Sequence, residues 1–421
     1  MIKRQLRDDC FVHDRDRMRH DEVLSLLAER LVQTVGAETI ALGMAAGRII
    51  DQDIMAPITV PQSDNAAVDG YAFAHTDYLA ADGQLTLGET ASAGRQRIDL
   101  AAGQAVRIFT GAVMPNGADS VAMQEDCRVE GPNVKIPAGL KRGANCRLAG
   151  EDVKTGERLI PQGHILSPAH IAALASVGID QVPVRARLRV GILSTGDEIV
   201  QPGATAAPHQ VFDANRPMLS ALLQDAKINL VDLGHLGDDR EKLQQTIEAA
   251  AANLDLIITS GGASRGGEDH MLDILDQLGN RHLWQIAVKP GRPIMFGQIG
   301  DCVLIGLPGN PVAAFVCTLA YVRPTMAHLM GTRPRRPRPL LLPAAFAIEK
   351  KKPDRREFAR GWRNKDGSVD KFARDGSGLI AGLTAAGGLI ELPEATTSVA
   401  KGDLVRFIPF DEFAIAHEDQ P

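Results

Sequence analysis

The chain has 421 residues, more than a single hydrophobic core usually organises, so we expect several domains. Its apolar fraction of 44% and charged fraction of 23% are those of an ordinary folded protein. The formal net charge of -6 provides no overall basic field, which argues against nucleic acid as a partner. The N-terminus lacks the apolar centre of a secretory signal, and no uncharged apolar run reaches bilayer-spanning length, so we expect a cytoplasmic protein without a membrane segment.

The cysteines point to the same reducing compartment. None of them has the close paired spacing of a zinc site or a redox pair. Cys302 and Cys317 stand among apolar neighbours and are interpreted as small buried hydrophobic residues rather than catalytic thiols. The full set is Cys10, Cys127, Cys146, Cys302 and Cys317.

The first predicted element is an amphipathic helix. Apolar residues at helical spacing run from Val23 to Val35, behind a plausible N-cap at Asp21. Residues 51–182 then carry short apolar runs, such as Ala105–Phe109 and Val134–Ile136, separated by glycine and proline. We therefore expect a mainly β region after the helix.

A second clear helix closes this region at Pro168–Val177. Ser167 is a good N-cap, Pro168 suits the first helical position and Gly178 ends the pattern. From residue 187 to about 330, strand-like runs alternate with helical stretches such as Pro217–Ala226 and Arg240–Ala252, which predicts a doubly wound, largely parallel sheet. The expected strands are Leu188–Leu193, Ile228–Leu233, Leu254–Thr259, Trp284–Val288 and Cys302–Leu307.

The remaining chain predicts a linker and a small β domain. Residues 333–339 read RPRRPRP, a basic, proline-rich segment typical of a stiff linker rather than of a nucleic-acid patch. Leu389–Leu392 and Leu404–Ile408, with glycine-rich turns between them, suggest a small barrel or sandwich. We expect a scaffold domain of residues 1–50 plus 150–185, an inserted mainly-β domain of 51–149, an α/β domain of 186–332 and a C-terminal β barrel of 333–421.

Polar residues follow most strands of the predicted α/β sheet. Ligands of open α/β sheets bind at the carboxyl ends of the strands, so these segments should meet at one edge. The segments are Ser194-Thr195-Gly196-Asp197-Glu198, Gly237-Asp238-Asp239, Ser260-Gly261-Gly262-Ala263-Ser264 leading to Glu268-Asp269, and Pro308-Gly309-Asn310-Pro311.

These residue types suit a phosphate-bearing ligand. Gly261 and Gly262 allow backbone N–H groups to approach an anion closely, and Asn310-Pro311 can open a helix whose N-terminus attracts anions. The carboxylates at the same edge, Glu198 among them, would repel a phosphate unless a divalent cation intervened, and Mg²⁺ prefers such oxygen ligands. Glycine-rich turns and caps occur in any doubly wound domain, so each turn alone is weak evidence.

Two further segments carry charge in unusual places. Pro61–Tyr71, with two acids, a proline and a glycine, is too polar for a core strand and is as compatible with a solvated turn as with a site. Lys289-Pro290-Gly291-Arg292-Pro293 sets two cations on a turn beside the predicted ligand edge, where they could hold oxyanions.

Taken in order, these segments resemble the molybdopterin molybdenumtransferase family, which includes the bacterial MoeA proteins and the E domain of gephyrin. The resemblance spans nearly the whole chain. The matching segments are Asp64-Asn65, Val68-Asp69-Gly70-Tyr71, Arg107–Gly111, Gly117-Ala118-Asp119, Gln124-Glu125, Gly150-Glu151-Asp152, Ser194–Glu198, Asp213-Ala214-Asn215-Arg216, Ser260–Asp269, Lys289–Pro293, Leu307–Val312 and Glu357–Gly361.

The resemblance implies a fold and a reaction. The fold has four domains, the α/β domain being similar to the MoaB and Mog proteins, and the protein is a homodimer whose cleft takes residues from both chains. The substrates are adenylylated molybdopterin and molybdate, Mg²⁺ is the cofactor, and the products are AMP and molybdenum cofactor. Molybdoenzymes or their chaperones are the partners expected downstream.

Roles for individual residues also follow from the resemblance. Residues that match the family's active site are Asp64, Thr110, Arg147, Asp152, Glu198, Asp238, Asp269 and Lys289. Of these, Glu198 and Asp269 would serve Mg²⁺. The substrate would be bound by Ser194, Thr195, Gly196, Ser260, Gly261, Gly262, Pro308, Gly309 and Asn310, and molybdate by Arg292, Pro293 and Arg360.

The chain departs from the family pattern at a few positions. Arg292 and Gln285 stand where lysine is common, Ala313 replaces a serine, and Ala381 and Gly382 stand where serines are frequent. Arginine still offers charge for an oxyanion, while the lost hydroxyl at position 313 removes a donor. These departures leave open a tungstate-preferring enzyme. The motifs are also compatible with a non-catalytic carrier of the pterin and with a scaffold, although a scaffold should carry a fused partner domain or a long linker.

Overall fold

The structure is a computed structural model that describes residues 17–261, 270–374 and 376–416 of the chain. The chain forms two compact units. Unit 1 comprises Met1–Glu38, Gly47–Ile49 and Val184–Pro421, and unit 2 comprises Thr39–Ala46 and Ile50–Pro183. Each unit has hydrophobic cores built from its own residues.

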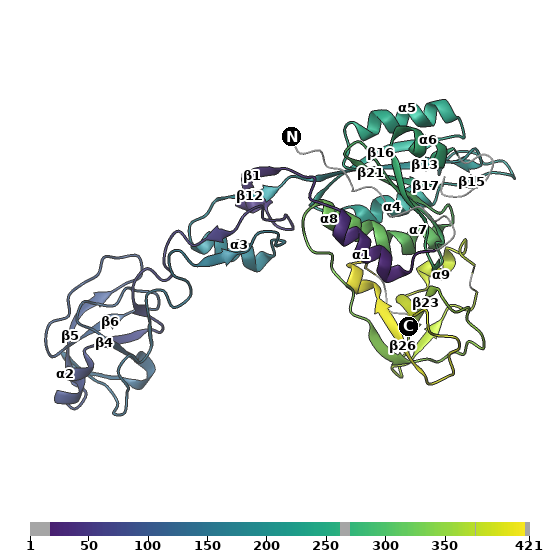
Figure 1. Cartoon of the computed structure of the whole chain (residues 1–421). Helices are drawn as coiled ribbons and strands as arrows, with labels where there is room; N and C mark the ends of the chain where they lie inside the picture. Colours follow the sequence, from purple (N-terminus) through teal and green to yellow (C-terminus); the bar gives the residue numbers. More distant parts are fainter. Residues whose placement is uncertain (1–16, 262–269, 375, 417–421) are drawn as a thin grey trace. The chain divides into compact units, whose positions relative to one another are not determined.

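A mixed sheet of six strands forms the centre of unit 1, in the order β16-β13-β17-β21-β20-β18 (Figure 1). Strands β16, β13, β17 and β21 are parallel, whereas β20 is antiparallel to both of its neighbours. The parallel part confirms the predicted α/β domain. The bounds are β13 Leu188–Thr195, β16 Ile228–Leu236, β17 Leu256–Ser260, β18 Asn280–Gln285, β20 Pro293–Ile299 and β21 Cys302–Leu307.

The antiparallel edge of this sheet differs from the prediction. The prediction of a single strand at Trp284–Val288 was wrong, because β18 ends at Gln285 and β19 (Val288–Lys289) pairs with a strand of a different sheet. Strand β20 was missed altogether. It forms a hairpin with β21 across Gly300-Asp301, and Gly300 has a φ of +57°. A two-residue loop that begins with glycine is a hairpin signal, so the sequence did carry this information.

The two faces of the sheet bury different cores. Because successive residues of a strand point to opposite faces, Val190 and Ile258 contact one core, while Leu193 and Ile257 contact the other. Figure 1 shows α5 and α6 on one side of the sheet and α4 and α7 on the other. The helices are α4 Asn215–Leu223, α5 Arg240–Ala251, α6 Met271–Leu278, α7 Pro311–Cys317 and α8 Arg323–Leu329.

Helices α7 and α8 belong to one long apolar helix, joined by a π turn at Thr318–Val322. This helix, Pro311–Leu329, is long and apolar enough to cross a membrane, but 78% of its most apolar stretch is buried inside the structure. Its residues pack against the strands and α1 in the main core of unit 1. Burial on all sides accounts for its composition.

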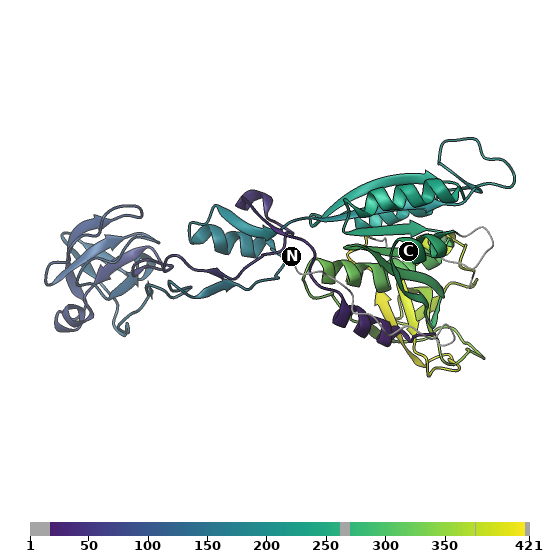
Figure 2. The same cartoon turned by 45° about the horizontal axis from the view of Figure 1, so that its top comes forward.

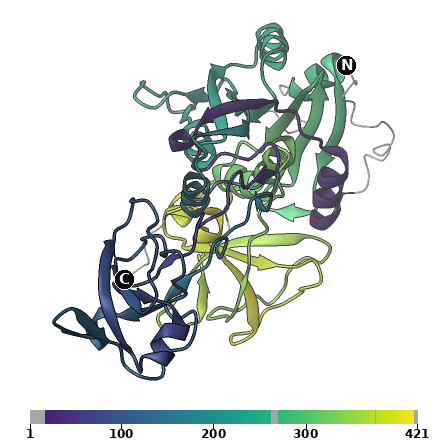
Figure 3. The ribbon, with the colours of Figure 1, turned by 90° about the vertical axis from the view of Figure 1, so that its left-hand side faces the viewer.

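A second sheet occupies the C-terminal part of unit 1, drawn in yellow-green and yellow in Figure 3. Its order is β19-β23-β25-β26-β22, with β24 paired to β23. The predicted runs at residues 389–392 and 404–408 correspond to β25 and β26. The bounds are β22 Leu340–Pro343, β23 Arg356–Arg363, β24 Val369–Lys371, β25 Gly388–Leu392 and β26 Leu404–Pro409, with α9 at Ala381–Thr384.

Unit 2 is mainly β, as predicted, with a sheet in the order β7-β4-β6-β5-β9-β8. Strand pairs β3-β10 and β2-β11 lie outside this sheet. Helix α3 also lies apart from it (Figure 2). Helix α3 (Pro168–Ser176) confirms the predicted cap, because Ser167 Oγ accepts a hydrogen bond from the amide of His170 at 3.3 Å. The remaining bounds are β2 Ile54–Met55, β3 Asn65–Ala66, β4 Gly70–Phe73, α2 His75–Ala80, β5 Gln84–Ala91, β6 Gln104–Ile108, β7 Ser120–Met123, β8 Arg128–Glu130, β9 Asn133–Lys135, β10 Cys146–Arg147 and β11 Arg158–Ile160.

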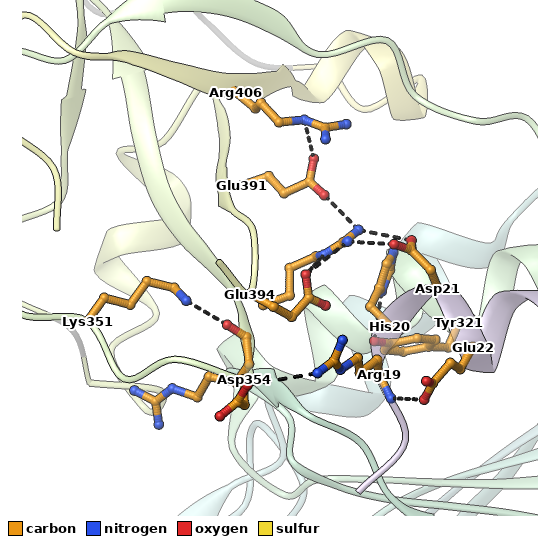
Figure 4. A network of polar contacts seen from close by, with 12 residues as sticks. Arg19, His20, Asp21, Glu22, Tyr321, Lys351, Asp354, Glu391, Glu394 and Arg406 are labelled. Carbon is orange, nitrogen blue, oxygen red and sulfur yellow. Dashed lines mark hydrogen bonds and ion pairs between the residues drawn. The ribbon is translucent and has the colours of Figure 1, made fainter. Parts of the chain in front are cut away.

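Helix α1 (His20–Arg30) is fastened to the C-terminal sheet by a buried arginine. The N-cap is Arg19 rather than the predicted Asp21. Asp21 instead accepts from both terminal nitrogens of Arg356, at 3.1 and 2.7 Å, and Arg356 also donates to Glu391 and Glu394 (Figure 4). A buried arginine needs such partners, because an unpaired buried charge is strongly destabilising. The structure thereby assigns α1 to unit 1.

His20 lies in the same region and is held neutral. It is buried against Phe358, and its Nδ1 is 2.9 Å from the hydroxyl of Tyr321. Burial, reinforced by the charge of Arg356, lowers the pKa of His20 from 6.5 to about 4. The unfolded chain therefore binds a proton at pH values where the folded protein does not.

We predict that His20 makes unit 1 acid-sensitive. As the pH falls from 6.5 towards 4, the wild-type protein should lose about 3 kcal/mol of unfolding free energy that a His20→Asn variant does not lose. Denaturant titrations at pH 7 and pH 4.5 can follow this by fluorescence, because both tryptophans, Trp284 and Trp362, belong to unit 1. The exposed His209→Asn is the control and should behave like the wild type. An equal loss of unfolding free energy between pH 7 and pH 4.5 in wild type and His20→Asn would contradict the prediction.

A second buried arginine fixes the start of α4. Arg216 Nε donates to Asp213 at 3.1 Å, and its Nη1 reaches both carboxylate oxygens of Asp232 on β16, at 2.8 and 2.7 Å. The side chain of Asp213 is only 2% exposed. Arg216 therefore joins the turn before α4 to the sheet.

Replacing this arginine should destabilise unit 1 substantially. We expect Arg216→Met to lower the unfolding free energy by about 3 kcal/mol, because it leaves the buried Asp213 without its cation. Tryptophan fluorescence in denaturant measures the effect. Lys242→Met, which breaks an exposed pair between α5 and its N-cap Asp239, should leave the unfolding midpoint unchanged. Equal midpoints for all three proteins would show that the buried pair contributes nothing.

Candidate active site

Three parallel strands of unit 1 end side by side and bring the predicted substrate residues together. Ser194 on β13 is paired in register with Ser260 on β17, and Ser260 is paired with Leu307 on β21. The residues at and just beyond the strand ends are Thr195-Gly196, Gly261 and Pro308-Gly309-Asn310. The structure therefore assembles the predicted edge, while Gly262 lies outside the described residues.

An asparagine that the sequence analysis did not select links two of these segments. Asn215, the first residue of α4, donates from Nδ2 to Ser260 Oγ at 2.7 Å and to the carbonyl of Gly309 at 2.7 Å. The amide of Gly261 also donates to the carbonyl of Leu307 at 3.2 Å. Position 215 did fall within a segment that resembles the family, and this was the one signal available.

Two glycines in these turns are needed for close contacts. Gly196 has a φ of +127°, and a Cβ there would lie 2.5 Å from Glu198 Oε2. Gly261 has a φ of +94°, and a Cβ there would lie 2.9 Å from the carbonyl oxygen of Thr195. The positive φ favours glycine at both positions, and at Gly261 the backbone of Thr195 also leaves no space for a side chain.

Carboxylates gather on the first two turns of this edge. The amide of Asp197 donates to Asp238 at 3.2 Å, and the amide of Asp238 donates back to Asp197 at 3.0 Å. Glu198 is exposed, with its carboxylate over Gly196. Within the part of the chain that the structure describes, no cluster of three metal-binding side chains occurs. Asp269, the other predicted metal ligand, lies outside that part.

The Lys289–Pro293 turn is held from two sides. Lys289 pairs in register with Glu357 on β23, and its Nζ is 3.4 Å from the Glu357 carboxylate, which Arg355 also contacts at 2.7 Å. Gly291 rests on the core helix, since a Cβ there would lie 2.3 Å from Cys317 Sγ. Burial raises the pKa of Cys317 to about 12, in agreement with the interpretation of a structural thiol. Arg292 is exposed on this turn.

Arg360, predicted to bind molybdate, is engaged with the protein itself. Its guanidinium is buried and donates to the carbonyls of Leu379 at 2.7 Å and Arg374 at 2.8 Å, with Phe372 stacked 5.0 Å away. A Cβ at Gly382 would lie 2.6 Å from Arg360 Nη1. Glycine at position 382 therefore leaves room for the guanidinium of Arg360.

The predicted helix N-terminus at Asn310-Pro311 exists, but part of it is occupied. Helix α7 has Asn310 as N-cap, without a side-chain cap hydrogen bond. The amide of Val312 donates to the carbonyl of Ser377 at 3.0 Å. Ala313, one of the expected departures from the family pattern, is buried in the core of unit 1.

The other predicted active-site residues belong to unit 2 and lie on neighbouring segments. Arg147 pairs in register with Asn65, and Asp64 accepts from the amide of Ala149 at 2.7 Å. Thr110 donates its amide and its hydroxyl to Asp69, each at 2.7 Å, and these bonds lower the pKa of Asp69. The amide of Asp152 donates to the carbonyl of Val60 at 3.2 Å, and its side chain is exposed.

Family models match most of the chain. Residues 18–178 match the MoeA N-terminal region (domain I and II), residues 191–328 a probable molybdopterin binding domain, and residues 343–410 the MoeA C-terminal region (domain IV). The chain is 35% identical to the molybdopterin molybdenumtransferase of Haemophilus influenzae, over 93% of this chain and 98% of that protein. It is 33% identical to molybdopterin molybdenumtransferase 2 of Mycobacterium tuberculosis, over 86% and 93%.

Solved structures agree with these matches. The crystal structure of the molybdopterin biosynthesis MoeA protein from Pyrococcus horikoshii OT3 is similar with a TM-score of 0.81 at 27% identity, over 94% of this chain and all of that one (100%). A second structure of a MoeA protein from the same species has a TM-score of 0.80 at 28% identity. The family models match residues of both units. The chain therefore belongs to the MoeA family of molybdopterin molybdenumtransferases, enzymes of molybdenum cofactor biosynthesis.

Proposed function

We propose that the protein, as a cytoplasmic homodimer, inserts molybdate into adenylylated molybdopterin with Mg²⁺ present and releases AMP. In this reaction water cleaves the phosphoanhydride of the adenylate, which releases AMP. The two dithiolene thiols bind molybdenum in place of oxo oxygen, which takes up the thiol protons and leaves as water. The observation that carries the proposal is the edge formed by Ser194, Ser260 and Gly309, at which glycine turns, hydroxyls and carboxylates of one family domain converge.

The edge supplies groups for the nucleotide end of the substrate. Turns at Gly196 and Gly261 have positive φ and no side chain, so backbone groups can come close to a phosphate. The hydroxyls of Ser194 and Ser260 are neighbours across the β13–β17 pairing. Such an edge binds an anionic, hydrogen-bonding ligand better than an apolar one.

The carboxylates fit a magnesium ion bound together with a phosphate. Mg²⁺ in such sites takes one or two carboxylates and fills its remaining positions with water and phosphate oxygens. Glu198 and Asp269 would hold it, as the resemblance implies, and Asp238 adds a third carboxylate at the same edge. Asp197, which exchanges hydrogen bonds with Asp238, would fix the turn that carries this third carboxylate. When bound, the ion would neutralise phosphate charge.

The cationic turn supplies groups for molybdate. Arg292 is exposed at the end of the turn, and Lys289 is tied to Glu357 at 3.4 Å. The two cations offer a fork and a point charge for an oxyanion. Arg360 would add a further positive charge, and its hydrogen bonds to two carbonyls also hold the neighbouring backbone in place.

The decisive assay is AMP release from adenylylated molybdopterin, with and without molybdate and Mg²⁺. Release that requires both supports the proposal. Tight binding without release would make the protein a carrier of the pterin. Competition between molybdate and tungstate in the same assay measures the preference that Arg292 and Ala313 leave open.

Removing the charge of Glu198 should abolish the metal-dependent step. We expect Glu198→Gln to lower AMP release at saturating substrate by a factor of about 100 or more, because loss of a metal-bearing carboxylate removes charge stabilisation of the reacting phosphate. Its unfolding midpoint should not change, since the side chain is exposed. Glu241→Gln on α5, also exposed, is the matched control with normal turnover. Normal turnover in Glu198→Gln would exclude a metal role for this carboxylate.

Exchange of the exposed arginine for the family residue tests the oxyanion contact. We expect Arg292→Lys to keep AMP release within about threefold of the wild type, because the charge stays and only the fork geometry is lost. Arg292→Ala should raise the molybdate concentration needed for half-maximal release. An inactive Arg292→Lys variant would indicate that the turn depends on the guanidinium itself.

A further inference from the structure

The segment Asp213-Ala214-Asn215-Arg216 lies next to the proposed substrate edge without a role in it. Arg216 anchors this segment to β16 through Asp213 and Asp232. The backbone of Asn215 is therefore fixed by its neighbour, and the residue is only 7% exposed. A fixed and buried polar side chain at the carboxyl edge of the sheet needs an explanation.

The orientation of the Asn215 amide follows from its contacts. The carbonyl of Gly309 can only accept a hydrogen bond, so the atom 2.7 Å from it must be the donor, Nδ2. The same nitrogen donates to Ser260 Oγ at 2.7 Å. One NH₂ group thus uses both of its hydrogens to connect the end of β17 to the turn that follows β21.

We infer that Asn215 is a positioning residue of the active site, which holds the Ser260-Gly261 and Pro308–Asn310 turns at the separation that binds the nucleotide-linked pterin. This inference rests on the proposed function for the identity of the ligand. At the strand ends, a backbone hydrogen bond from the Gly261 amide to the Leu307 carbonyl also connects the two segments. That bond fixes the backbones but leaves the Ser260 hydroxyl and the Gly309 carbonyl to be oriented by Asn215.

The other end of the amide argues against a purely structural role. Asn215 Oδ1 is buried without a hydrogen-bond partner among the described residues, and so is Ser194 Oγ on the neighbouring strand. Buried polar groups are usually satisfied, and an exception calls for an explanation, such as a functional role or a bound water or ion. An asparagine selected only to fasten two turns would be expected to use its oxygen too.

The test compares two variants with a matched control. Asn215→Ala removes the donor, and Asn215→Asp replaces it with an acceptor that faces the Gly309 carbonyl. The control is Asn253→Asp, because Asn253 Nδ2 also donates to a backbone carbonyl, that of Ala249 at 3.1 Å, but at the exposed end of α5. Each protein is assayed for AMP release as a function of adenylylated molybdopterin, for its unfolding midpoint, and for backbone hydrogen exchange.

We expect the KM of Asn215→Ala to rise about tenfold and that of Asn215→Asp to rise further, with kcat within about threefold of the wild type. Hydrogen exchange should become faster in peptides that cover residues 256–261 and 305–310 and remain unchanged in β16. The control should match the wild type in all respects. A residue that only stabilised the fold would instead lower the midpoint and speed exchange throughout unit 1.

The inference and the proposed function can fail separately. A wild-type KM in an active Asn215→Asp enzyme would overturn the positioning role and leave the function intact. Exchange that stays unchanged in both turns would overturn it as well. A wild-type protein that releases no AMP would refute the proposed function, and faster exchange confined to the two turns in Asn215→Ala would then still support the positioning role.

Discussion

The parallel register of β13, β17 and β21 is the constraint on which the rest of unit 1 depends. Ser194, Ser260 and Leu307 lie in line across these three strands. The segments that follow the three strands therefore all start from the same edge of the sheet. The register is in turn fixed by burial on both faces, since a shift by one residue would exchange the two cores. The packing of the sheet and the geometry of the candidate site are therefore set by the same apolar residues.

The sequence predicted best what is decided locally. Strands buried on both faces appear as continuous apolar runs, and the cap at Ser167 depends on a neighbour three residues away, so both could be predicted. Asp21 could not be predicted in this way. Its position suits a helix cap, but its carboxylate binds Arg356, which is 335 residues away in the chain. Non-local ion pairs leave no local pattern, and the same reason hides the pairing of β19 with β23.

The candidate site shows the same division. Strand ends followed by glycine and polar residues predicted the edge, because the carboxyl ends of parallel strands must meet there. Nothing in the local sequence distinguishes Asn215, which acts through two acceptors on other segments, at positions 260 and 309. For Arg360, by contrast, the sequence did supply a role, because the resemblance assigned it to molybdate. The structure adds what the sequence could not show: two carbonyl acceptors, and a glycine at position 382 that leaves space for the guanidinium.

These contacts bear on which departures from the family pattern matter for the oxyanion. Ala313 is buried in the core of unit 1, so a hydroxyl lost there is far from solvent. Gly382 acts through the position of Arg360, whose nitrogens already serve carbonyl groups. Arg292 is exposed, and the neighbouring Lys289 contacts a carboxylate shared with Arg355. Of these three positions, Arg292 is the one whose charge faces solvent, so we propose that selectivity between oxyanions be sought there first.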